Sequence, residues 1–573
     1  MKDQETHHHD QYGDWPPADG RHEDTAWQDP ASYPRYRPQQ YAQQPYEQPY
    51  PQPYEQVAAH VVTGTQAHPA DGREAGPEAP AVPGYVVPEV PVSAWSIDTR
   101  RSTWIGRSLV LCVLLVQAGL SFRLGGRAFA AEAYYLAPGH HRIGHSGVYP
   151  VVAKAADAVG GLAAARSLSL LFMLGVTALL YAMTSRMFNE RAGLAAAGLF
   201  AVVESTELLG SLATADAMAL FLIAAAAWAL VRTGRSHPSL ALLAAPFAAL
   251  APATKSVAVL YLPSLVVLAV LSAYPYRGAR AFLRGLFFGA GTLLLLGAAA
   301  YLSGGLDGLT SATTGRAHGT DPALDVLWRS AEWGGLVLLV AVGGAVDYVR
   351  RSRMGEMPWA TGDTPGAVRR TALGLLMCGT ALLAPVCQAY LNDDVSLFKH
   401  VGFGLLFAAP MAGLGISRLV GAHFRYPQLG IMVWVGVLVV GMAQTQTLYR
   451  PPDSGQMVNT LRKVVGKDGR YLAEQAEIPA YYLADSTRRD QWHGTRDIDF
   501  TDKSGEHHTG PDGFRRAVRA GWFDAIVLNG DVTPGTDKAI TDALHGNSGY
   551  RLLAVLPSTD AYGSTTYRIW VKR

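Results

Sequence analysis

The sequence of 573 residues has little charge and almost no cysteine. Charged residues make up 16% of the chain and apolar residues 49%, which is a low share of charge for a soluble protein. The three cysteines, Cys112, Cys378 and Cys387, all lie in apolar stretches, and their spacing matches neither a disulfide framework nor a zinc site. They are therefore predicted to be small core residues.

A cleavable signal is also lacking, because residues 1–100 are polar, so insertion would rely on the first apolar stretch as an uncleaved anchor. This segment is rich in Pro, Tyr and Gln, with a near-repeat of Gln-Pro-Tyr at 44–46, 48–50 and 52–54. It buries too little apolar surface to offset chain entropy, and we expect a disordered cytoplasmic tail with polyproline II character. It is either a solvated tail or a docking site for a partner that recognises proline or modifies tyrosine.

Apolar stretches recur through the middle of the chain, separated by short polar links. A helix needs roughly twenty apolar residues to cross the hydrocarbon core of a membrane, and about eleven stretches approach that length. They predict a polytopic α-helical membrane domain over 101–450. The link 123–163, here called the first long loop, and the link 303–332 are long enough to hold ordered structure. The predicted spans are 104–122, 164–184, 192–210, 213–231, 238–253, 256–273, 281–302, 333–349, 370–391, 400–420 and 428–447.

Basic residues are concentrated in alternate links of this domain. With the tail in the cytoplasm, the cytoplasmic links hold most of the Lys and Arg, as the positive-inside rule requires. The alternation predicts a multi-pass protein of the plasma membrane with a cytoplasmic N-terminus and an extracytoplasmic C-terminal region. The basic links are 186–191, 232–235, 277–284, 350–370 and 418–425.

Residues 451–573 have a different character, because helix-like and strand-like stretches alternate there. Such alternation predicts a compact α/β domain of about 120 residues. By span parity it lies on the outer face. The helix-like stretches are 457–465, 511–520 and 537–544, and the strand-like ones are 470–473, 525–529, 550–556 and 566–572.

Ionisable residues within or beside membrane spans are costly, so each is a candidate functional residue. Glu132 lies in the first long loop, with Arg123 upstream and His140 downstream. A carboxylate near the membrane surface can act as a general base toward a hydroxyl, or can bind a metal. The alternative is an interfacial loop in which Tyr134 and Tyr135 are aromatic anchors.

Asp216 and Lys255 lie at the predicted outer ends of later spans. Asp216 starts the fourth predicted span, where it either caps the helix or joins Glu204 and Glu207 in an acidic patch. Lys255 lies in a tight turn between two spans, where it either extends to lipid headgroups or binds a phosphate.

Lys399 and His400 precede the tenth predicted span and follow the acidic run 392–394. Cations at a helix N-terminus oppose the helix dipole, so they indicate an anionic ligand to which the helix amides also contribute. Arg316 and His318 form a weaker case of the same kind. Cations and carboxylates gathered at one membrane face are what a lipid-linked phosphate donor requires.

The order of these parts resembles the GT-C glycosyltransferases of the protein O-mannosyltransferase and lipid A aminoarabinose transferase superfamily, in particular bacterial family 39 members of actinobacterial type. The resemblance extends over residues 101–573. It rests on the segments 129–135, 160–166, 213–220, 254–255 and 396–400.

The resemblance implies an enzyme that moves a sugar from a polyprenyl-phosphate donor to a glycan, lipid or protein acceptor of the cell envelope. It implies that the first long loop carries membrane-parallel helices and forms the active-site cavity with the outer ends of the spans. Glu132 matches the Glu of the family's Asp-Glu pair, and Asp216 matches an acidic position of a later span, so both are candidate catalytic residues. The candidate substrate-binding residues are Arg123, His140, Lys255, Lys399 and His400. No cofactor and no nucleic-acid partner are implied, and a divalent metal is not indicated.

Position 131 departs from the family, because Ala131 stands where the family has the Asp usually credited as catalytic base. Alanine cannot take a proton. Either Glu132 or Asp216 replaces that Asp, or the protein is a catalytically degenerate relative that binds lipid-linked sugar or acts as a scaffold of envelope assembly. A transporter is a third class, but the sequence shows no internal repeat or matched pair of broken helices.

Overall fold

The computed structural model describes residues 99–137, 148–302, 319, 321–350, 366–394, 396–421, 426–530, 532–560 and 563–573, with side chains from residue 106. The predicted tail lies outside the described residues, apart from the first turn of a helix that begins at Thr99. His140, Arg316 and His318 also lie outside them.

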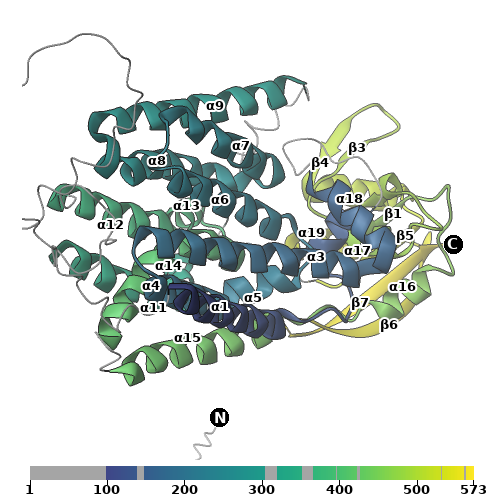
Figure 1. The fold of residues 1–573 in the computed structure, drawn as a ribbon. Coiled ribbons are helices and arrows are strands. Elements are labelled where there is room, and N and C mark those ends of the chain that lie inside the picture. Colours follow the sequence, from purple (N-terminus) through teal and green to yellow (C-terminus); the bar gives the residue numbers. More distant parts are fainter. Residues whose placement is uncertain are drawn as a thin grey trace, which may run out of the picture. The chain divides into compact units, whose positions relative to one another are not determined.

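Each predicted span falls on a helix or on consecutive helices (Figure 1). The single helices are α1 (Thr99–Ser121), α6 (Ala215–Arg232), α9 (Ala281–Leu302), α11 (Ala323–Arg350), α14 (Leu397–Val420) and α15 (Pro427–Leu448). α3 (Tyr149–Met187) is kinked, because its backbone is not helical at Gly160 and Gly161, and the predicted span 164–184 lies after the kink. The consecutive helices are α4 (Glu190–Ala201) with α5 (Glu204–Ser211), η2 (Pro238–Ala244) with α7 (Ala245–Thr254), η3 (Ser256–Tyr261) with α8 (Leu262–Arg277), and α12 (Ala367–Ala381) with α13 (Leu383–Leu391). A 3-10 turn, η4 (Gly278–Arg280), links α8 to α9.

Among the described residues, six helices are long and apolar enough to cross a membrane, or up to eight if each bent pair is one span. One of the six, Ser256–Tyr301, includes both α8 and α9, which pack against each other. The pairs α4–α5 and α12–α13 bend by 65° and 41°. At the first bend Val203 has an extended backbone and begins α5. The sequence does not predict this bend, because neither glycine nor proline occurs at positions 201–205.

The helical bundle is built around α14, which packs against α4, α11 and α12. Small residues allow the close approach of these helices. A Cβ at Gly413 would lie 2.3 Å from the Ala192 carbonyl oxygen, and one at Gly344 would lie 2.1 Å from the Met411 carbonyl oxygen. Such small-residue contacts are typical of helix packing in membranes. By contrast, α9 and α15 expose many apolar side chains, as expected of helices that face lipid.

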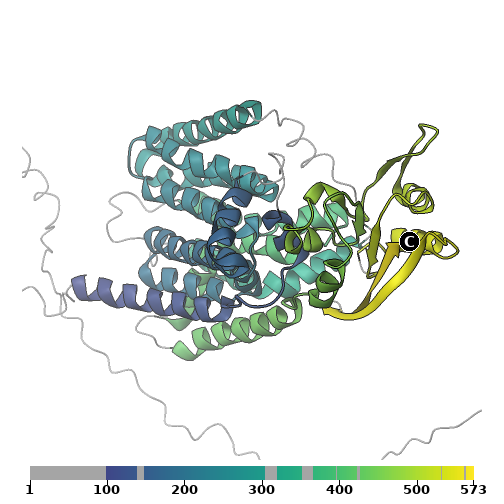
Figure 2. The ribbon, with the colours of Figure 1, turned by 90° about the vertical axis from the view of Figure 1, so that its right-hand side faces the viewer.

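The C-terminal region is the predicted α/β domain, and it lies at one end of the helical bundle (Figures 1 and 2). Its five-stranded sheet has the order β2-β1-β5-β7-β6, in which β1 pairs in parallel with β2 and β5, and β7 pairs antiparallel with β5 and β6. The strands are β1 (Tyr471–Ala473), β2 (Trp492–His493), β5 (Ala525–Leu528), β6 (Tyr550–Asp560) and β7 (Gly563–Lys572), and a separate hairpin is formed by β3 (Asp499–Thr501) and β4 (His507–Thr509). The helices are α16 (Gly455–Leu461), α17 (Glu477–Tyr482), α18 (Gly510–Arg519) and α19 (Pro534–Leu544), with a 3-10 turn η6 (Arg489–Gln491).

Alternate side chains of the sheet belong to two different cores. Ile526 packs with Phe514 of α18 and Ile540 of α19, whereas Val527 packs in a second core with Leu461 of α16. This follows from the strand geometry, because successive side chains point to opposite faces of a sheet. The second core also contains Ala133 from the first long loop.

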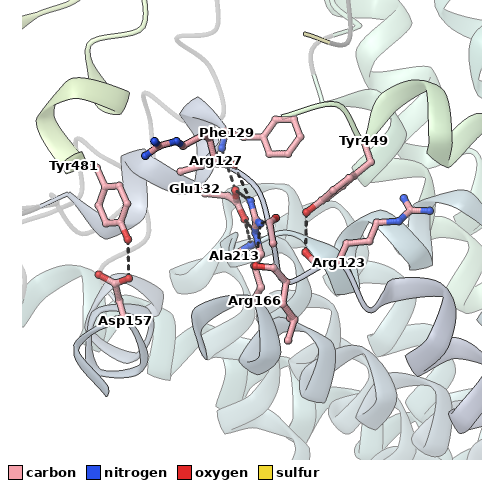
Figure 3. A network of polar contacts seen from close by, with 12 residues as sticks. Arg123, Arg127, Phe129, Glu132, Asp157, Arg166, Ala213, Tyr449 and Tyr481 are labelled. Atoms are coloured by element: carbon pink, nitrogen blue, oxygen red, sulfur yellow. Dashed lines mark hydrogen bonds and ion pairs between the residues drawn. The ribbon is translucent and has the colours of Figure 1, made fainter. Parts of the chain in front are cut away.

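The first long loop is therefore joined to the C-terminal domain. Its helix α2 (Ala130–Leu136) packs on α17. The backbone N–H of Ala128 donates to the Tyr482 hydroxyl oxygen at 2.8 Å, and the Tyr481 hydroxyl donates to Asp157 Oδ1 on α3 at 2.8 Å (Figure 3). These contacts place α2 between the helical bundle and the sheet.

Candidate functional site

A cavity of about 620 Å³ lies where the first long loop, the helix ends and the C-terminal domain meet. Aromatic side chains, carboxylates and cations all contribute to its wall, so it can contact both apolar and charged parts of a ligand. Its wall includes Ala131, Glu132 and Tyr134 from α2, Lys399 from α14, and Glu474, Glu477, Arg496 and Asp497 from the C-terminal domain.

Glu132 is fully buried, and four hydrogen bonds end on its carboxylate (Figure 3). Arg166 of α3 donates through Nε to Oε1 at 2.8 Å and through Nη2 to Oε2 at 2.7 Å. The backbone N–H of Ala213 donates to Oε1 at 2.8 Å. The backbone N–H of Phe129 donates to Oε2 at 3.0 Å, in the manner of the Glu of a capping box at the start of α2.

Arg166, the partner of Glu132, is also fully buried and has further hydrogen bonds of its own. Its guanidinium donates to the carbonyl oxygens of Gly125 and Arg127, the latter at 3.0 Å. The pair thus fixes the first long loop onto α3 and onto the link before α6. A carboxylate offers about four lone-pair positions, so the four described donors fill the acceptor capacity of Glu132.

Asp216 lies in the first turn of α6 and is fully buried. Its Oδ1 lies 3.2 Å from Lys255 Nζ, whose side chain is partly exposed. Thr214 is the N-cap residue, and the helix start has no capping bond from a side chain, so helix capping does not account for Asp216. Lys399 and His400 add positive charge close to the same carboxylate.

The structure thus brings together four of the residues that the sequence singled out: Asp216, Lys255, Lys399 and His400. Lys399 and His400 are buried in the first turn of α14, and only Lys399 reaches the cavity wall. Asp216 and Lys255 pack behind that wall. The cluster is a buried carboxylate surrounded by cations, which can hold an anionic group next to it.

Arg123 is placed apart from this cluster. Its guanidinium lies 3.9 Å from Glu207 of α5 and stacks 5.1 Å from the centre of the Tyr449 ring. Tyr449 in turn donates its hydroxyl to the Arg123 carbonyl oxygen at 2.8 Å (Figure 3). Arg123 does not line the cavity, whereas Tyr449 does.

The C-terminal domain contributes carboxylates to the cavity that sequence reasoning did not identify. Glu474, at the end of β1, accepts hydrogen bonds from the backbone N–H groups of four residues between 529 and 533. Burial alone would raise its pKa, but hydrogen bonds with Asp537 and with these amides hold the pKa below its ordinary value. Glu474 therefore orders the loop before α19.

Glu477 differs from Glu474, although both line the cavity. It lies in the first turn of α17, is half-buried, and has no hydrogen bond or ion pair with any described residue. Its charge acts on Tyr134 of α2, whose pKa is raised mainly by burial and further by the nearby Tyr135 and Glu477, against the opposing effect of Arg489. Arg489 approaches the other side of Tyr134, donating to its carbonyl oxygen at 3.2 Å. The sequence around Glu477 contains no motif, so its position in the cavity wall follows only from the packing of α17 on α2.

Two groups of described side chains are close enough to hold a metal ion. One is Asp502, Glu506 and His508 in the β3–β4 hairpin, and the other is Asp321, Asp393 and Asp394 before α11 and α14. Neither group lines the cavity. The hairpin group bonds within itself, since His508 and Asp502 lie 3.0 Å apart.

Comparisons with known sequences agree with a GT-C architecture. The family model described as dolichyl-phosphate-mannose-protein mannosyltransferase matches residues 157–302. No curated protein matches the sequence. The matched region includes Arg166, Asp216 and Lys255, but it ends before α14.

Solved structures match over a much larger part of the chain. The oligosaccharyltransferase of Archaeoglobus fulgidus in the apo form has a TM-score of 0.52 at 10% identity, over 82% of this chain and 75% of that one. The same archaeal enzyme, AglB, with an inhibitory peptide and a dolichol-phosphate has a TM-score of 0.50 at 10% identity, over 81% and 74%. ArnT from Cupriavidus metallidurans bound to undecaprenyl phosphate has a TM-score of 0.50 at 11% identity, over 82% and 98%.

At these identities the similarity concerns the fold. The chain is a multi-pass membrane protein with the GT-C fold, as the sequence resemblance predicted.

Proposed function

Because the chain has the GT-C fold, we propose that it is a membrane glycosyltransferase that moves a sugar from a polyprenyl-phosphate donor to a cell-envelope acceptor. The observation that carries the proposal is the cavity where Lys399 of the helical bundle meets carboxylates of the C-terminal domain. The solved ArnT and AglB structures hold a polyprenyl or dolichyl phosphate, which supports a lipid phosphate as the donor. The positive-inside pattern supports an orientation with the cavity and the C-terminal domain on the outer face of the plasma membrane.

In this reaction the acceptor hydroxyl oxygen attacks the anomeric carbon of the donor sugar. The bond from that carbon to the phosphate oxygen breaks, and the lipid phosphate leaves with the bonding electrons. Lys399, with Lys255 and His400 behind it, stabilises the negative charge of the phosphate. The acceptor proton passes to a carboxylate, which must have a free oxygen facing the cavity.

That requirement separates the available carboxylates. Glu132 has its acceptor positions filled by four donors, so we assign it a positioning role in the first long loop. Asp216 is fully buried against Lys255, so we assign it the role of orienting that lysine. Glu477 lines the cavity without a described partner, and we assign it the role of general base.

The position of Glu477 also accounts for Ala131. Residues 131 and 134 lie three apart on α2 and thus share one face of that helix. Glu477 is close enough to Tyr134 for its charge to raise the tyrosine pKa, and all three residues line the cavity. These observations support the proposal that a carboxylate from α17 replaces the Asp that the resembling family has at position 131.

The proposal is tested by transfer from radiolabelled polyprenyl-phosphate mannose to endogenous envelope acceptors in membranes that contain the full chain. We expect Glu477→Gln to lower the transfer rate by about 10²- to 10⁴-fold, the range for loss of a general base. We expect Lys399→Met to raise the KM for the donor, because it removes a cation from the phosphate site. The matched control is Asp497→Asn, which also changes a carboxylate in the cavity wall but should retain most of the rate.

Two results would overturn these assignments. Absence of transfer by the wild-type chain from every polyprenyl-phosphate sugar tested would reject the glycosyltransferase itself. Wild-type transfer that Glu477→Gln leaves intact would reject only the base assignment. If Glu132→Gln and Asp216→Asn also keep the wild-type rate, neither of the carboxylates predicted from the sequence takes part.

The second candidate function is a catalytically degenerate relative that binds lipid-linked sugar. Two observations favour this second function. Position 131 is an alanine, and the acceptor positions of Glu132 are filled, so α2 has no free carboxylate. In that case the wild-type chain would bind the donor but transfer no sugar, and Ala131→Asp would produce a large gain in transfer.

A further inference from the structure

A second, smaller pocket of about 50 Å³ lies at the other end of the membrane helices. It is lined by the last turns of α3, α6 and α8 and the first turn of α12. Asp216 lies in the first turn of α6 and Arg232 is its last residue, so at about 1.5 Å per residue the two sites are separated by about 24 Å along the helix. This pocket is thus at the membrane face opposite the cavity.

Three arginines converge on this pocket: Arg186 of α3, Arg235 of the turn after α6, and Arg369 of α12. Tyr276 and Ser272 add hydroxyl groups to its wall. Together these side chains offer guanidinium and hydroxyl donors from four separate segments of the chain. Here we call this set the arginine pocket.

Existing contacts hold two of these arginines in place. The Arg235 guanidinium stacks over the Tyr276 ring at 4.7 Å and donates to its hydroxyl at 3.4 Å. Arg369 Nε donates to the Leu271 carbonyl oxygen at 3.1 Å, and the two terminal nitrogens of its guanidinium bond to none of the described residues. Arg186 is half-buried and has no hydrogen bond or ion pair with a described residue.

The charge of the arginine pocket is not balanced within the described part of the chain. None of its three arginines has an Asp or Glu oxygen within 4.0 Å among the residues that the structure describes. Arg284 adds a fully buried guanidinium nearby, which donates to the Leu230 and Thr233 carbonyl oxygens at 2.6 and 2.7 Å. Arg186 and Arg369 are half-buried, whereas Arg235 is exposed. Half-buried cations without a carboxylate partner among the described residues favour binding of an anion, because desolvation strengthens their field.

We propose that the arginine pocket binds the phosphate group of an anionic phospholipid. Guanidinium groups match phosphate oxygens with paired hydrogen bonds, and basic pockets between membrane helices bind lipid headgroups in this way. The small volume favours the phosphate group over a whole headgroup. The site lies at the ends of the helices, where we expect lipid phosphates to be in reach.

The positive-inside rule by itself explains arginines in these links, but it predicts solvated side chains. Convergence on one pocket, the partial burial of Arg186 and Arg369, and the hydroxyl groups in the wall are additional features that this rule does not require. The proposal is independent of sugar transfer, because no residue of the arginine pocket lines the large cavity.

The test uses the purified full chain in a neutral detergent, with binding followed by native mass spectrometry. The probes are short-chain phosphatidylglycerol, phosphatidylcholine of the same chain length, and inorganic phosphate. We expect phosphatidylglycerol to bind, and the double variant Arg186→Gln/Arg369→Gln to weaken this binding by at least about tenfold. The matched control is Arg280→Gln/Arg350→Gln, which removes two exposed arginines outside the pocket and should change binding by less than about twofold.

Three outcomes would overturn the proposal. The first is equal loss of binding in the two double variants, which would indicate a general effect of net charge. The second is equal binding of phosphatidylcholine, which would indicate that the acyl chains alone are recognised. The third is inorganic phosphate binding as tightly as phosphatidylglycerol, which would assign the site to a free anion. Should the double variant unfold, the single variant Arg186→Lys, which keeps the charge but loses paired hydrogen bonds, must still weaken binding.

Discussion

Glu132 and Glu477 line the same cavity but are held in opposite ways. Glu132 is fully buried, paired with Arg166 and bonded by four donors, whereas Glu477 is half-buried and has no partner among the described residues. Glu474, from the same C-terminal domain, repeats the first pattern with four backbone amides. A carboxylate with filled acceptor positions serves to position the chain, while one with open positions is free to exchange a proton with a substrate.

The largest expected effect is that of Glu132→Ala on folding. The substitution leaves Arg166 as an uncompensated buried charge, which costs about 3–5 kcal/mol of unfolding free energy. Thermal unfolding of the full chain in detergent measures this loss, with Glu477→Ala as the matched control in the same cavity. The control should change stability by no more than about 0.5 kcal/mol. Similar unfolding temperatures for the two variants would contradict the structural role of Glu132.

Glu474→Gln should have a smaller effect that depends on pH. The folded pKa of Glu474 is below its ordinary value of 4.5, so its stabilisation is fully present above about pH 4.5 and is lost as the pH falls through the folded pKa. At pH 7 the variant should lose about 1–3 kcal/mol, because amides that bonded the carboxylate lose their acceptor. The measurement is the difference in unfolding temperature between wild type and variant from pH 7 to pH 3. A difference in unfolding temperature that grows toward acid pH would contradict the expected direction of the pH dependence.

Much of the fold could be predicted from the sequence because its signals are local. Apolar stretches mark helices such as α6 and α14, and alternation of helix-like and strand-like stretches marks the C-terminal sheet. The bend at Val203 could not be predicted, since it depends on how α5 packs and not on a helix-breaking residue. Local signals therefore identify the elements but not their exact course.

The candidate site could be predicted only in part, because sequence signals are local. Asp216 and Lys255 stand out as ionisable residues at helix ends, and the structure places them 3.2 Å apart. The saturation of Glu132 depends on Arg166 and on the Ala213 amide, which lie 34 and 81 residues away in the chain. Glu477 is more than three hundred residues from α2 and has no motif, so only the tertiary structure brings it to the cavity.

Ala131→Asp tests whether positions 131 and 477 are interchangeable. In the Glu477→Gln background, an aspartate at 131 should restore transfer by about tenfold, because it places a carboxylate on the face of α2 that Tyr134 shares. Ala131→Asn in the same background is the control for volume and polarity without a proton acceptor. Equal transfer rates for Ala131→Asp and Ala131→Asn would show that a carboxylate at position 131 does not replace that of Glu477.

The smallest effect concerns the anchor that holds α17, and with it Glu477, against the helical bundle. Tyr481→Phe removes the hydroxyl that donates to Asp157 Oδ1 at 2.8 Å, while the ring can still pack in place. Because the contact is partly exposed, we expect a loss of about 1 kcal/mol in unfolding free energy. If the anchor positions Glu477, the transfer rate at saturating donor should fall several-fold while the KM for the donor stays near the wild-type value. Tyr482→Phe, which removes the neighbouring hydroxyl bonded to the Ala128 amide, is the comparison for a contact that holds α2 instead. A fall in unfolding temperature without any change in rate would limit Tyr481 to a role in stability.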